Sequence, residues 1–346
     1  MYHTLCGYVP ERSKERSIVP CAPAQLVPSR PAVSPSRRLF TPLKEKDSDS
    51  QGDNPRHIFD ELKAIIPNGC FTSFYERASK TDAPMEPAAN DNLIIQLAGT
   101  CKTVEEFLSQ MPILTDLQVL QIETETRGQA SNQTWVSQRR GRITASNFYS
   151  VFTRVNTIKA NPSKDHNVEP LLRKLMGCDV IKENIPALNY GKEYEPIAKE
   201  KYAALMNCNH KEFTVTESGL FVDSARPFLG ASPDLLVHCT CCGAGLSEIK
   251  CPLSIADEIP SAANLPYLVE CDNVTTMKKD HAYYAQIQGQ LALSKRKYCD
   301  FFVFTQVGYF MQRIYFDNSY WEKLVSNLEY FFNNFVTSRL LSGESL

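Results

Sequence analysis

The residues best suited to chemistry lie in one segment, GASPDLLVHCTCCGAGLSEIKCP, which has the pattern of strand, turn and strand. Alternate side chains of a strand point to the same face, so Glu248 and Lys250 would share a face while Ile249 points to the core. Pairing of the two strands would bring Asp234 next to Glu248. The segment therefore predicts two carboxylates and one lysine at a single spot.

Such a group suits the hydrolysis of phosphodiesters. Carboxylate oxygens are ligands for Mg²⁺ or Mn²⁺, and the bound ion lowers the pKa of water and neutralises charge on the phosphate. The lysine would position the attacking water and stabilise the same charge. The backbone carbonyl of Ile249 would add a further ligand. The residues by themselves indicate a metal-dependent phosphodiesterase.

Two other segments carry polar side chains that fit this site. Glu195 stands in GKEYEP, where we expect it in the first turn of a helix, and it is a candidate ligand for a second metal ion. Gln286 and Gln290 lie four residues apart in AQIQGQ and so share one face of an otherwise apolar helix.

The cysteines of the same hairpin allow a second interpretation, a zinc site. Its candidate ligands are His238, Cys239, Cys241 and Cys242. The C-x-C-C spacing is irregular for structural zinc, and neighbouring Cys241 and Cys242 do not easily reach one ion. We favour a turn of reduced thiols at 240–245, with Gly243 and Gly245 at positive φ, and keep zinc as the alternative.

The whole chain has 346 residues, of which 43% are hydrophobic, and it can bury a substantial core. Residues 1–90 are rich in Pro, Ser and charge, so we expect a largely disordered tail with one short amphipathic segment at 57–67. Residues 91–346 form the predicted domain. Lys and Arg total 37 against 39 Asp and Glu, so any basic nucleic-acid surface must be local.

The spacing of hydrophobic residues predicts where the helices and strands of this domain lie. It predicts helices over 103–112, 117–128, 165–176 and 189–206, then strands over 212–217, 220–223, 227–238 and 246–250. A helix over 280–294, strands over 297–306 and 309–316, and a long helix over 319–341 follow. This order predicts an α/β fold, with a central mixed β-sheet flanked by helices.

The motifs RRGRITAS, GKEYE, GASPD, EIKCP and YYAQIQGQ occur in this order. With them, residues 135–316 resemble the YqaJ and lambda-exonuclease branch of the PD-(D/E)XK nucleases, and are most similar to animal proteins with a YqaJ viral recombinase domain. The resemblance implies a restriction-endonuclease-like core. It also implies catalytic roles for five residues: Asp234, Glu248, Lys250, Glu195 and Gln286.

The resemblance further divides these roles. Asp234, Glu248, Glu195 and the Ile249 carbonyl would together bind two metal ions. Lys250 would serve the nucleophilic water, and Gln286 would orient the catalytic groups. Arg139, Ser146 and Ser232 match residues that hold the 5′-phosphate of a DNA end. Leu235 departs from the family, whose members usually have glycine there, but it removes no catalytic atom.

Other notable side chains are expected in ordinary structural places. We expect Arg142 in a solvated loop, Trp135 in the core, and His210 and His281 at the surface or at helix caps. The basic residues at 295–297 either line a DNA channel or lie on the surface, and the sequence favours neither.

The predicted function is a Mg²⁺-dependent deoxyribonuclease, a 5′-to-3′ exonuclease on linear duplex DNA that acts in recombination or in mobile elements. The alternatives are an endonuclease with the same site and a non-catalytic binding module on the nuclease fold. The resemblance implies double-stranded DNA ends as partners, together with a single-strand annealing protein and a homo-oligomer. We expect an intracellular protein, nuclear or cytoplasmic, without a membrane segment.

Overall fold

Three short helices open the domain, and each begins at a residue whose side chain caps it. The computed structural model describes residues 3–4, 92–178 and 185–343. Asn92, Thr103 and Thr115 each accept a hydrogen bond from a backbone N–H in the first turn of the next helix. The helices are α3 (Leu93–Thr100), α4 (Val104–Ser109) and α5 (Asp116–Glu125).

An arginine-rich loop follows, and it is not solvated as expected. The elements around it are α6 (Gln133–Arg139), β2 (Ile143–Thr144), a 3-10 turn (Ala145–Asn147) and α7 (Phe148–Ala160). Arg142 is 1% exposed and donates hydrogen bonds to the Pro227 carbonyl at 3.0 Å and to Gln138 Oε1 at 3.1 Å. The prediction for Arg142 was wrong because these two acceptors replace water around a buried guanidinium.

The main sheet has six strands in the order β1-β11-β10-β7-β6-β3. They are β1 (His3–Thr4), β3 (Thr214–Thr216), β6 (Leu235–Cys239), β7 (Gly243–Lys250), β10 (Tyr298–Phe304) and β11 (Tyr309–Tyr315). β7 and β10 pair in parallel, and the other neighbours are antiparallel. The sheet is therefore mixed, as predicted.

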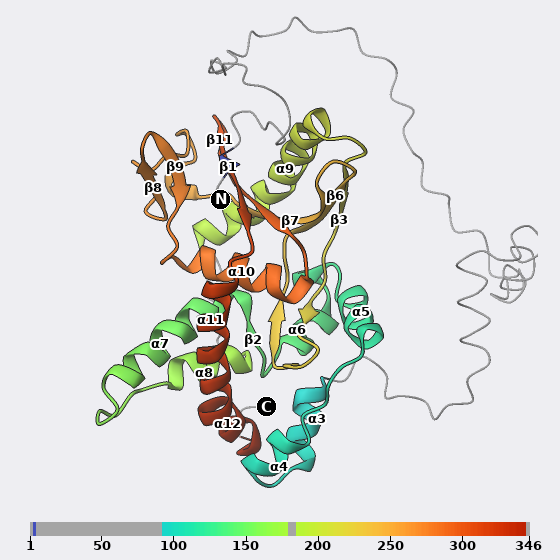
Figure 1. Ribbon diagram of the computed structural model, residues 1–346, viewed down its shortest axis with the longest axis vertical. Coiled ribbons are helices and arrows are strands. Elements are labelled where there is room, and N and C mark those ends of the chain that lie inside the picture. The colour runs from blue at the N-terminus through green and yellow to red at the C-terminus, as the bar shows by residue number, and fades with distance from the viewer. Residues whose placement is uncertain (1–2, 5–91, 179–184, 344–346) are drawn as a thin grey trace, which may run out of the picture. The chain divides into compact units, whose positions relative to one another are not determined.

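One helix packs on each face of this sheet, and the strand alternation decides which side chains it meets (Figure 1). On one face, α10 (Ala282–Ser294) contributes Tyr284 and Ile287 to a core with Leu246 and Phe301. On the other face, α9 (Pro186–Asn209) contributes Ala198, Tyr202 and Met206 to a core with Leu235, Val237, Ile249 and Phe302. Glu248 and Lys250, which alternate with Ile249, therefore point toward the α10 side.

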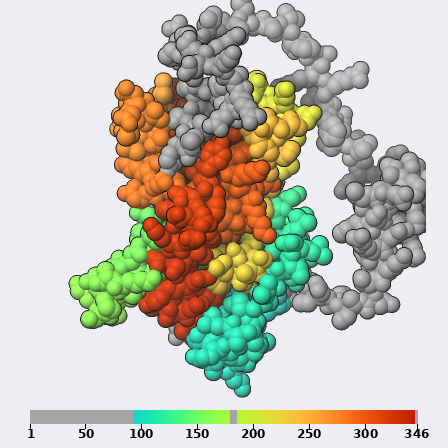
Figure 2. Space-filling model, viewed as in Figure 1, coloured from blue at the N-terminus to red at the C-terminus, as the bar shows by residue number. Residues whose placement is uncertain are grey.

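Two small sheets and further helices complete the domain. The sheets contain β2, β4 (Phe221–Val222) and β5 (Leu229–Ala231), and β8 (Leu268–Cys271) with β9 (Val274–Met277). The remaining helices are α8 (Glu169–Met176), α11 (Asn318–Phe331), a π turn (Phe332–Val336) and α12 (Thr337–Leu341). Figure 2 shows the C-terminal helices, in red, packed between α7, in green, and the α3–α4 segment, in cyan.

The α/β class, with a central mixed sheet flanked by helices, is confirmed. Apart from residues 3 and 4, which pair with β11, the predicted tail at 1–90 lies outside the described residues, as does its segment at 57–67. The tail and the domain boundary thus stay predictions. Among the described helices, none combines the length and the apolar character needed to cross a membrane.

Candidate functional site

The β6–β7 hairpin brings the three predicted catalytic side chains together. Leu235 pairs with Ser247, which places Asp234 opposite Glu248 at the next step of the antiparallel ladder. The Ile249 backbone N–H donates to Asp234 Oδ2 at 2.7 Å, and Lys250 Nζ donates to Glu248 Oε1 at 2.5 Å. The expected convergence of two carboxylates and one lysine is a feature of the fold.

Two glutamines of α10 hold the Glu248 carboxylate from the opposite side. Gln286 Nε2 donates to Glu248 Oε1 and Gln290 Nε2 donates to Glu248 Oε2, both at 2.7 Å. Gln286 therefore contacts Glu248, one of the residues that it was predicted to orient. Gln290 makes an equivalent contact but was given no role in the sequence analysis, although its spacing of four residues from Gln286 already placed both side chains on one helical face.

The charges of Asp234, Glu248 and Lys250 favour the binding of a further cation. Burial and the charge of Glu248 raise the pKa of Asp234 to about 7, against the attraction of Lys250. Burial lowers the pKa of Lys250, but the charges of Glu248 and Asp234 outweigh burial, so its pKa is raised and the side chain stays charged. Two acids thus face one ammonium, and the oxygen donors fit a hard divalent ion such as Mg²⁺.

The three residues predicted to bind a 5′-phosphate line the same cavity as Asp234, Glu248 and Lys250. Its volume is about 190 Å³. Its lining residues are Gln129, Trp135, Arg139, Thr144, Ala145, Ser146, Ser232, Asp234, Glu248, Lys250, Gln286 and Gln290. One small space is therefore lined by a cationic wall, of Arg139, Ser146 and Ser232, and by an acidic wall, of Asp234, Glu248, Lys250, Gln286 and Gln290. The two walls come from segments far apart in the sequence.

The surroundings of Arg139 keep its guanidinium charged and leave N–H groups that can bind an anion. Its guanidinium lies 3.9 Å from the centre of the Trp135 ring, and burial lowers its pKa to about 10, so it remains charged at neutral pH. Among the described residues, it donates one hydrogen bond, to Thr144 Oγ1 at 3.4 Å, which leaves N–H groups for a ligand. Trp135 in turn donates from Nε1 to Ser232 Oγ at 2.9 Å.

Trp135 packs against a hydrophobic core cluster that includes Ile122 and Val222, as expected, but it also takes part in the site, which the sequence analysis did not foresee. Its ring lines the cavity, supports Arg139 and orients Ser232. A tryptophan has an apolar ring and one N–H donor, so it can pack against the protein and still serve a polar site.

Glu195 is not in the first turn of its helix, because α9 begins at Pro186. Its carboxylate accepts a hydrogen bond from Lys199 at 2.6 Å, and its side chain is 41% exposed. It does not line the cavity, since α9 covers the other face of the sheet. Its charge still contributes to the raised pKa of Asp234, after burial and Glu248. A metal role for Glu195 stays a prediction.

The basic residues at 295–297 differ in their roles. Arg296 donates hydrogen bonds to the carbonyls of Val237 at 3.0 Å and Gly245 at 2.8 Å. It therefore links β6 to β7 and stabilises the hairpin rather than lining a channel. Lys295 pairs with Asp116 at 3.5 Å and is largely exposed.

Gly245 is needed because the Tyr298 ring leaves no space for a side chain, since a Cβ there would lie 2.3 Å from that ring. It does not have the positive φ that was expected of it.

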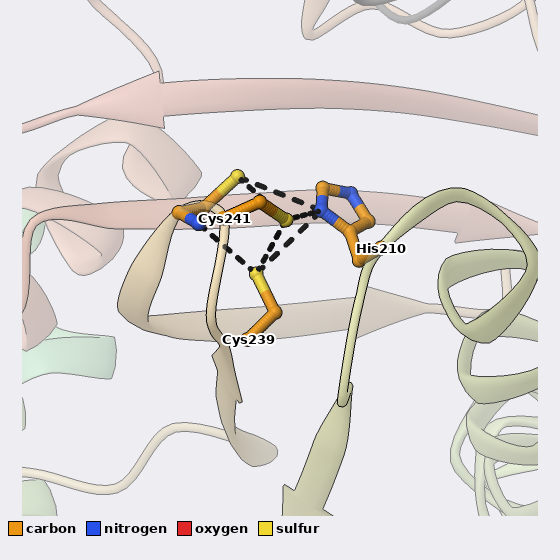
Figure 3. Close-up of side chains that lie close together, drawn as sticks. His210, Cys239 and Cys241 are labelled. Atoms are coloured by element: carbon orange, nitrogen blue, oxygen red, sulfur yellow. Dashed lines mark hydrogen bonds between the residues drawn. The ribbon is translucent and has the colours of Figure 1, made fainter.

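The cysteine turn has a histidine beside it, but a different one from that predicted. His238 is exposed on β6, where the strand alternation turns it away from its neighbour Cys239. His210, expected at the surface or at a cap, is the C-cap residue of α9, and its ring lies against the thiols (Figure 3). The resulting Cys3His cluster consists of His210, Cys239, Cys241 and Cys242. His281 does cap α10.

Comparison with known proteins finds one family model that matches part of the chain and several similar solved structures. Residues 134–297 match the model of the YqaJ-like viral recombinase domain. An alkaline exonuclease from Laribacter hongkongensis is 25% identical, with 60% of this chain and 94% of that chain covered and a TM-score of 0.45. The shutoff and exonuclease protein of Kaposi's sarcoma-associated herpesvirus is 13% identical, with 84% of each chain covered and a TM-score of 0.42. No curated protein matches.

Proposed function

We propose that this chain, whose residues 134–297 match the YqaJ-like viral recombinase domain, is a metal-dependent deoxyribonuclease of the PD-(D/E)XK type. One observation carries the proposal. The catalytic group of Asp234, Glu248 and Lys250 shares a single cavity with Arg139 and its hydroxyl neighbours. A candidate site for hydrolysis and a candidate site for an anion therefore border the same cavity.

Each residue of the acidic wall has a role in this reaction. Asp234 and Glu248, with the Ile249 carbonyl, would hold Mg²⁺, which when bound neutralises charge on the scissile phosphate and acidifies water. Lys250 positions the attacking water and stabilises charge that develops on the phosphate oxygens. Gln286 and Gln290 hold the Glu248 carboxylate in one orientation, as side chains that orient a metal ligand do.

The cationic wall supports an exonuclease that starts from a 5′-phosphate. A terminal phosphate carries more charge than an internal one and offers more oxygens to Arg139, Ser146 and Ser232. Anchoring the end there would present the first phosphodiester to Lys250 and fix a 5′-to-3′ direction. An annealing partner and a homo-oligomer remain predictions from the family resemblance.

The test is digestion of linear duplex DNA with a 5′-phosphate or a 5′-hydroxyl, and of closed circles, in Mg²⁺ and in EDTA. We expect Mg²⁺-dependent release of nucleotides from linear duplexes, faster with the 5′-phosphate, and intact circles. Cleavage of circles at the same rate would favour an endonuclease. Binding of DNA without any hydrolysis in Mg²⁺ or Mn²⁺ would favour the non-catalytic module.

Replacing Arg139 by glutamine is expected to remove the preference for phosphorylated ends. One charge-assisted hydrogen-bonding group contributes about 1.5–3 kcal/mol, so the rate on 5′-phosphorylated duplex should fall about 10- to 100-fold. The rate on 5′-hydroxyl duplex should change little. Arg140→Gln is the matched control, because Arg140 is the next residue but does not line the cavity. An equal loss on both substrates would contradict a phosphate-specific role.

Replacing Gln290 by leucine is expected to lower the hydrolysis rate about 10- to 100-fold, as is usual when a group that orients a metal ligand is lost. Gln290 is fully buried, and leucine fills similar space but cannot donate to Glu248. Gln121→Leu on the exposed side of α5 serves as the control. The measurement is the initial rate at saturating and limiting Mg²⁺. An unchanged rate at both concentrations would show that Gln286 alone orients Glu248.

A further inference from the structure

The Cys3His cluster has the arrangement of a single-ion site. Its four ligand atoms all lie within 4.8 Å of one another. His210 Nδ1 is 3.1 Å from Cys241 Sγ and 3.5 Å from the Sγ atoms of Cys239 and Cys242. The sulfur of Cys241 is 3.4 Å from that of Cys239 and 3.9 Å from that of Cys242. Figure 3 shows the side chains converging on one point.

These distances are within about 0.5 Å of the edges of a tetrahedron around zinc. Zn–S bonds of about 2.3 Å and Zn–N bonds of about 2.0–2.1 Å imply sulfur–sulfur edges of about 3.8 Å and sulfur–nitrogen edges of about 3.6 Å. A disulfide would instead need two sulfurs about 2.05 Å apart, and none of the described cysteines forms one. The thiols therefore surround a point rather than pair with each other.

The backbone resolves the objection that neighbouring cysteines do not reach one ion. The turn between β6 and β7 is tight, and Gly243 follows it at φ +76°, a conformation that favours glycine. Within this turn, the Cys242 backbone N–H donates a hydrogen bond to Cys239 Sγ at 3.3 Å. This bond holds the turn in a bent conformation around the Cys239 sulfur. The preference for a plain turn of reduced thiols, drawn from spacing alone, did not include this curvature or a ligand from α9.

The surroundings also suit a charged metal–thiolate centre. Cys239 is fully buried and His210 is 9% exposed, so two ligands are held rigidly inside the domain. Three thiolates and a neutral histidine around Zn²⁺ leave one net negative charge. The positive charge of the Arg313 guanidinium, which is held by Asp300 at 2.7 and 2.9 Å, acts on the Cys242 sulfur and favours its thiolate form.

We propose that the Cys3His cluster binds one structural zinc ion. The ion would join the residue that ends α9 to the turn between β6 and β7. The same hairpin carries Asp234, Glu248 and Lys250: Asp234 comes just before β6, roughly 17 Å from Cys239 along the strand. The zinc thus holds the hairpin against α9 without taking part in hydrolysis. This inference does not depend on the proposed nuclease activity.

The experiment measures metal content in the full chain. Protein purified without added metal is analysed for zinc by plasma mass spectrometry, and the same chain is reconstituted with Co²⁺ for its absorption spectrum. We expect one zinc per chain and the intense thiolate-to-cobalt bands of a tetrahedral site. Chelation of the zinc should lower the melting temperature of the wild-type chain.

Matched variants identify the ligands. Cys241→Ser and His210→Gln are each expected to lower zinc content at least tenfold, and Cys241 is exposed enough for serine to leave the core intact. Cys208→Ser and His238→Gln should keep one zinc, since both side chains are exposed outside the cluster.

Three results would overturn the proposal. They are a folded wild-type chain that holds no zinc and binds no Co²⁺, a disulfide found among these cysteines by mass spectrometry under reducing purification, and loss of zinc in His238→Gln with retention in His210→Gln. Circular dichroism of each variant separates loss of metal from loss of fold.

Discussion

Replacing Lys250 by methionine is expected to lower the rate of Mg²⁺-dependent hydrolysis on the order of 10³-fold, while duplex binding is retained. The Lys250 ammonium lies 2.5 Å from Glu248 Oε1 and 4.9 Å from the centre of the Tyr283 ring. Methionine keeps most of the stem that packs there but has no donor and no charge. The attacking water and the developing charge on the phosphate would therefore lose their cationic partner.

Glu248→Gln should have an effect of the same size for a related reason. The Glu248 carboxylate accepts hydrogen bonds from three side chains, those of Lys250, Gln286 and Gln290. A glutamine amide would bring its own N–H donors against one or more of these donors, and it would also lose the negative charge that attracts the metal.

The measurement is the single-turnover rate on 5′-phosphorylated duplex, together with binding of the same duplex in EDTA by fluorescence anisotropy. Lys201→Met is the control, since Lys201 is an exposed lysine on α9. If Lys250→Met or Glu248→Gln hydrolysed DNA within about threefold of the wild-type rate, the assignment of the catalytic group would be wrong. Loss of binding along with hydrolysis would indicate damage to the fold instead.

Asp234→Asn is expected to inactivate the protein and, in EDTA, to make it more stable. Burial and the charge of Glu248 raise the pKa of Asp234 from 3.8 to about 7. That shift corresponds to about 4 kcal/mol, and because the carboxylate borders an open cavity we expect about 2 kcal/mol to be recovered at pH 8. The amide oxygen of the asparagine side chain would still accept the hydrogen bond that the Ile249 N–H donates.

The sign of the effect follows from the direction of the shift. An acid whose pKa is raised by folding binds its proton more tightly in the folded state, so the wild-type chain loses stability as pH rises from about 4 to about 7. The asparagine variant has no such loss. The difference in unfolding free energy between the two should therefore be small near pH 4.5 and reach its plateau above pH 7.5.

Urea unfolding at pH 4.5, 6 and 8 in EDTA checks this prediction, with Asp165→Asn, an exposed acid, as the control. Adding Mg²⁺ should stabilise the wild-type chain and leave Asp234→Asn unchanged, because a ligand stabilises only the state that binds it. A variant no more stable than wild type at any pH would show that Asp234 does not carry an unfavourable charge in the folded chain.

The sequence by itself determined the geometry of the hairpin that carries the candidate catalytic residues. A strand has a period of two residues and an antiparallel pair has a fixed register, so the positions of Asp234, Glu248 and Lys250 relative to one another follow from local spacing. The same reasoning placed Ile249 in the core, where it is 4% exposed. Because these are properties of one hairpin, no distant contact was needed to predict them.

Contacts between segments far apart in the chain were decided only by the tertiary structure. Arg142 was assigned to the wrong environment, and the site contacts of Trp135 and His210 were not foreseen. Each of these side chains depends on a partner that no local spacing identifies: Pro227, Ser232 and the cysteine turn, respectively. Glu195 was placed in a first turn, since the motif does not show that α9 begins at Pro186.

The cysteine turn illustrates the physical reason. Its spacing, read along the chain, argued against zinc, while its histidine comes from the end of a helix on the other side of the hairpin. Local sequence specifies which side chains share a face, because backbone geometry repeats over a few residues. Which faces meet depends on how helices and sheets bury their apolar surfaces together, and that is a property of the folded chain as a whole.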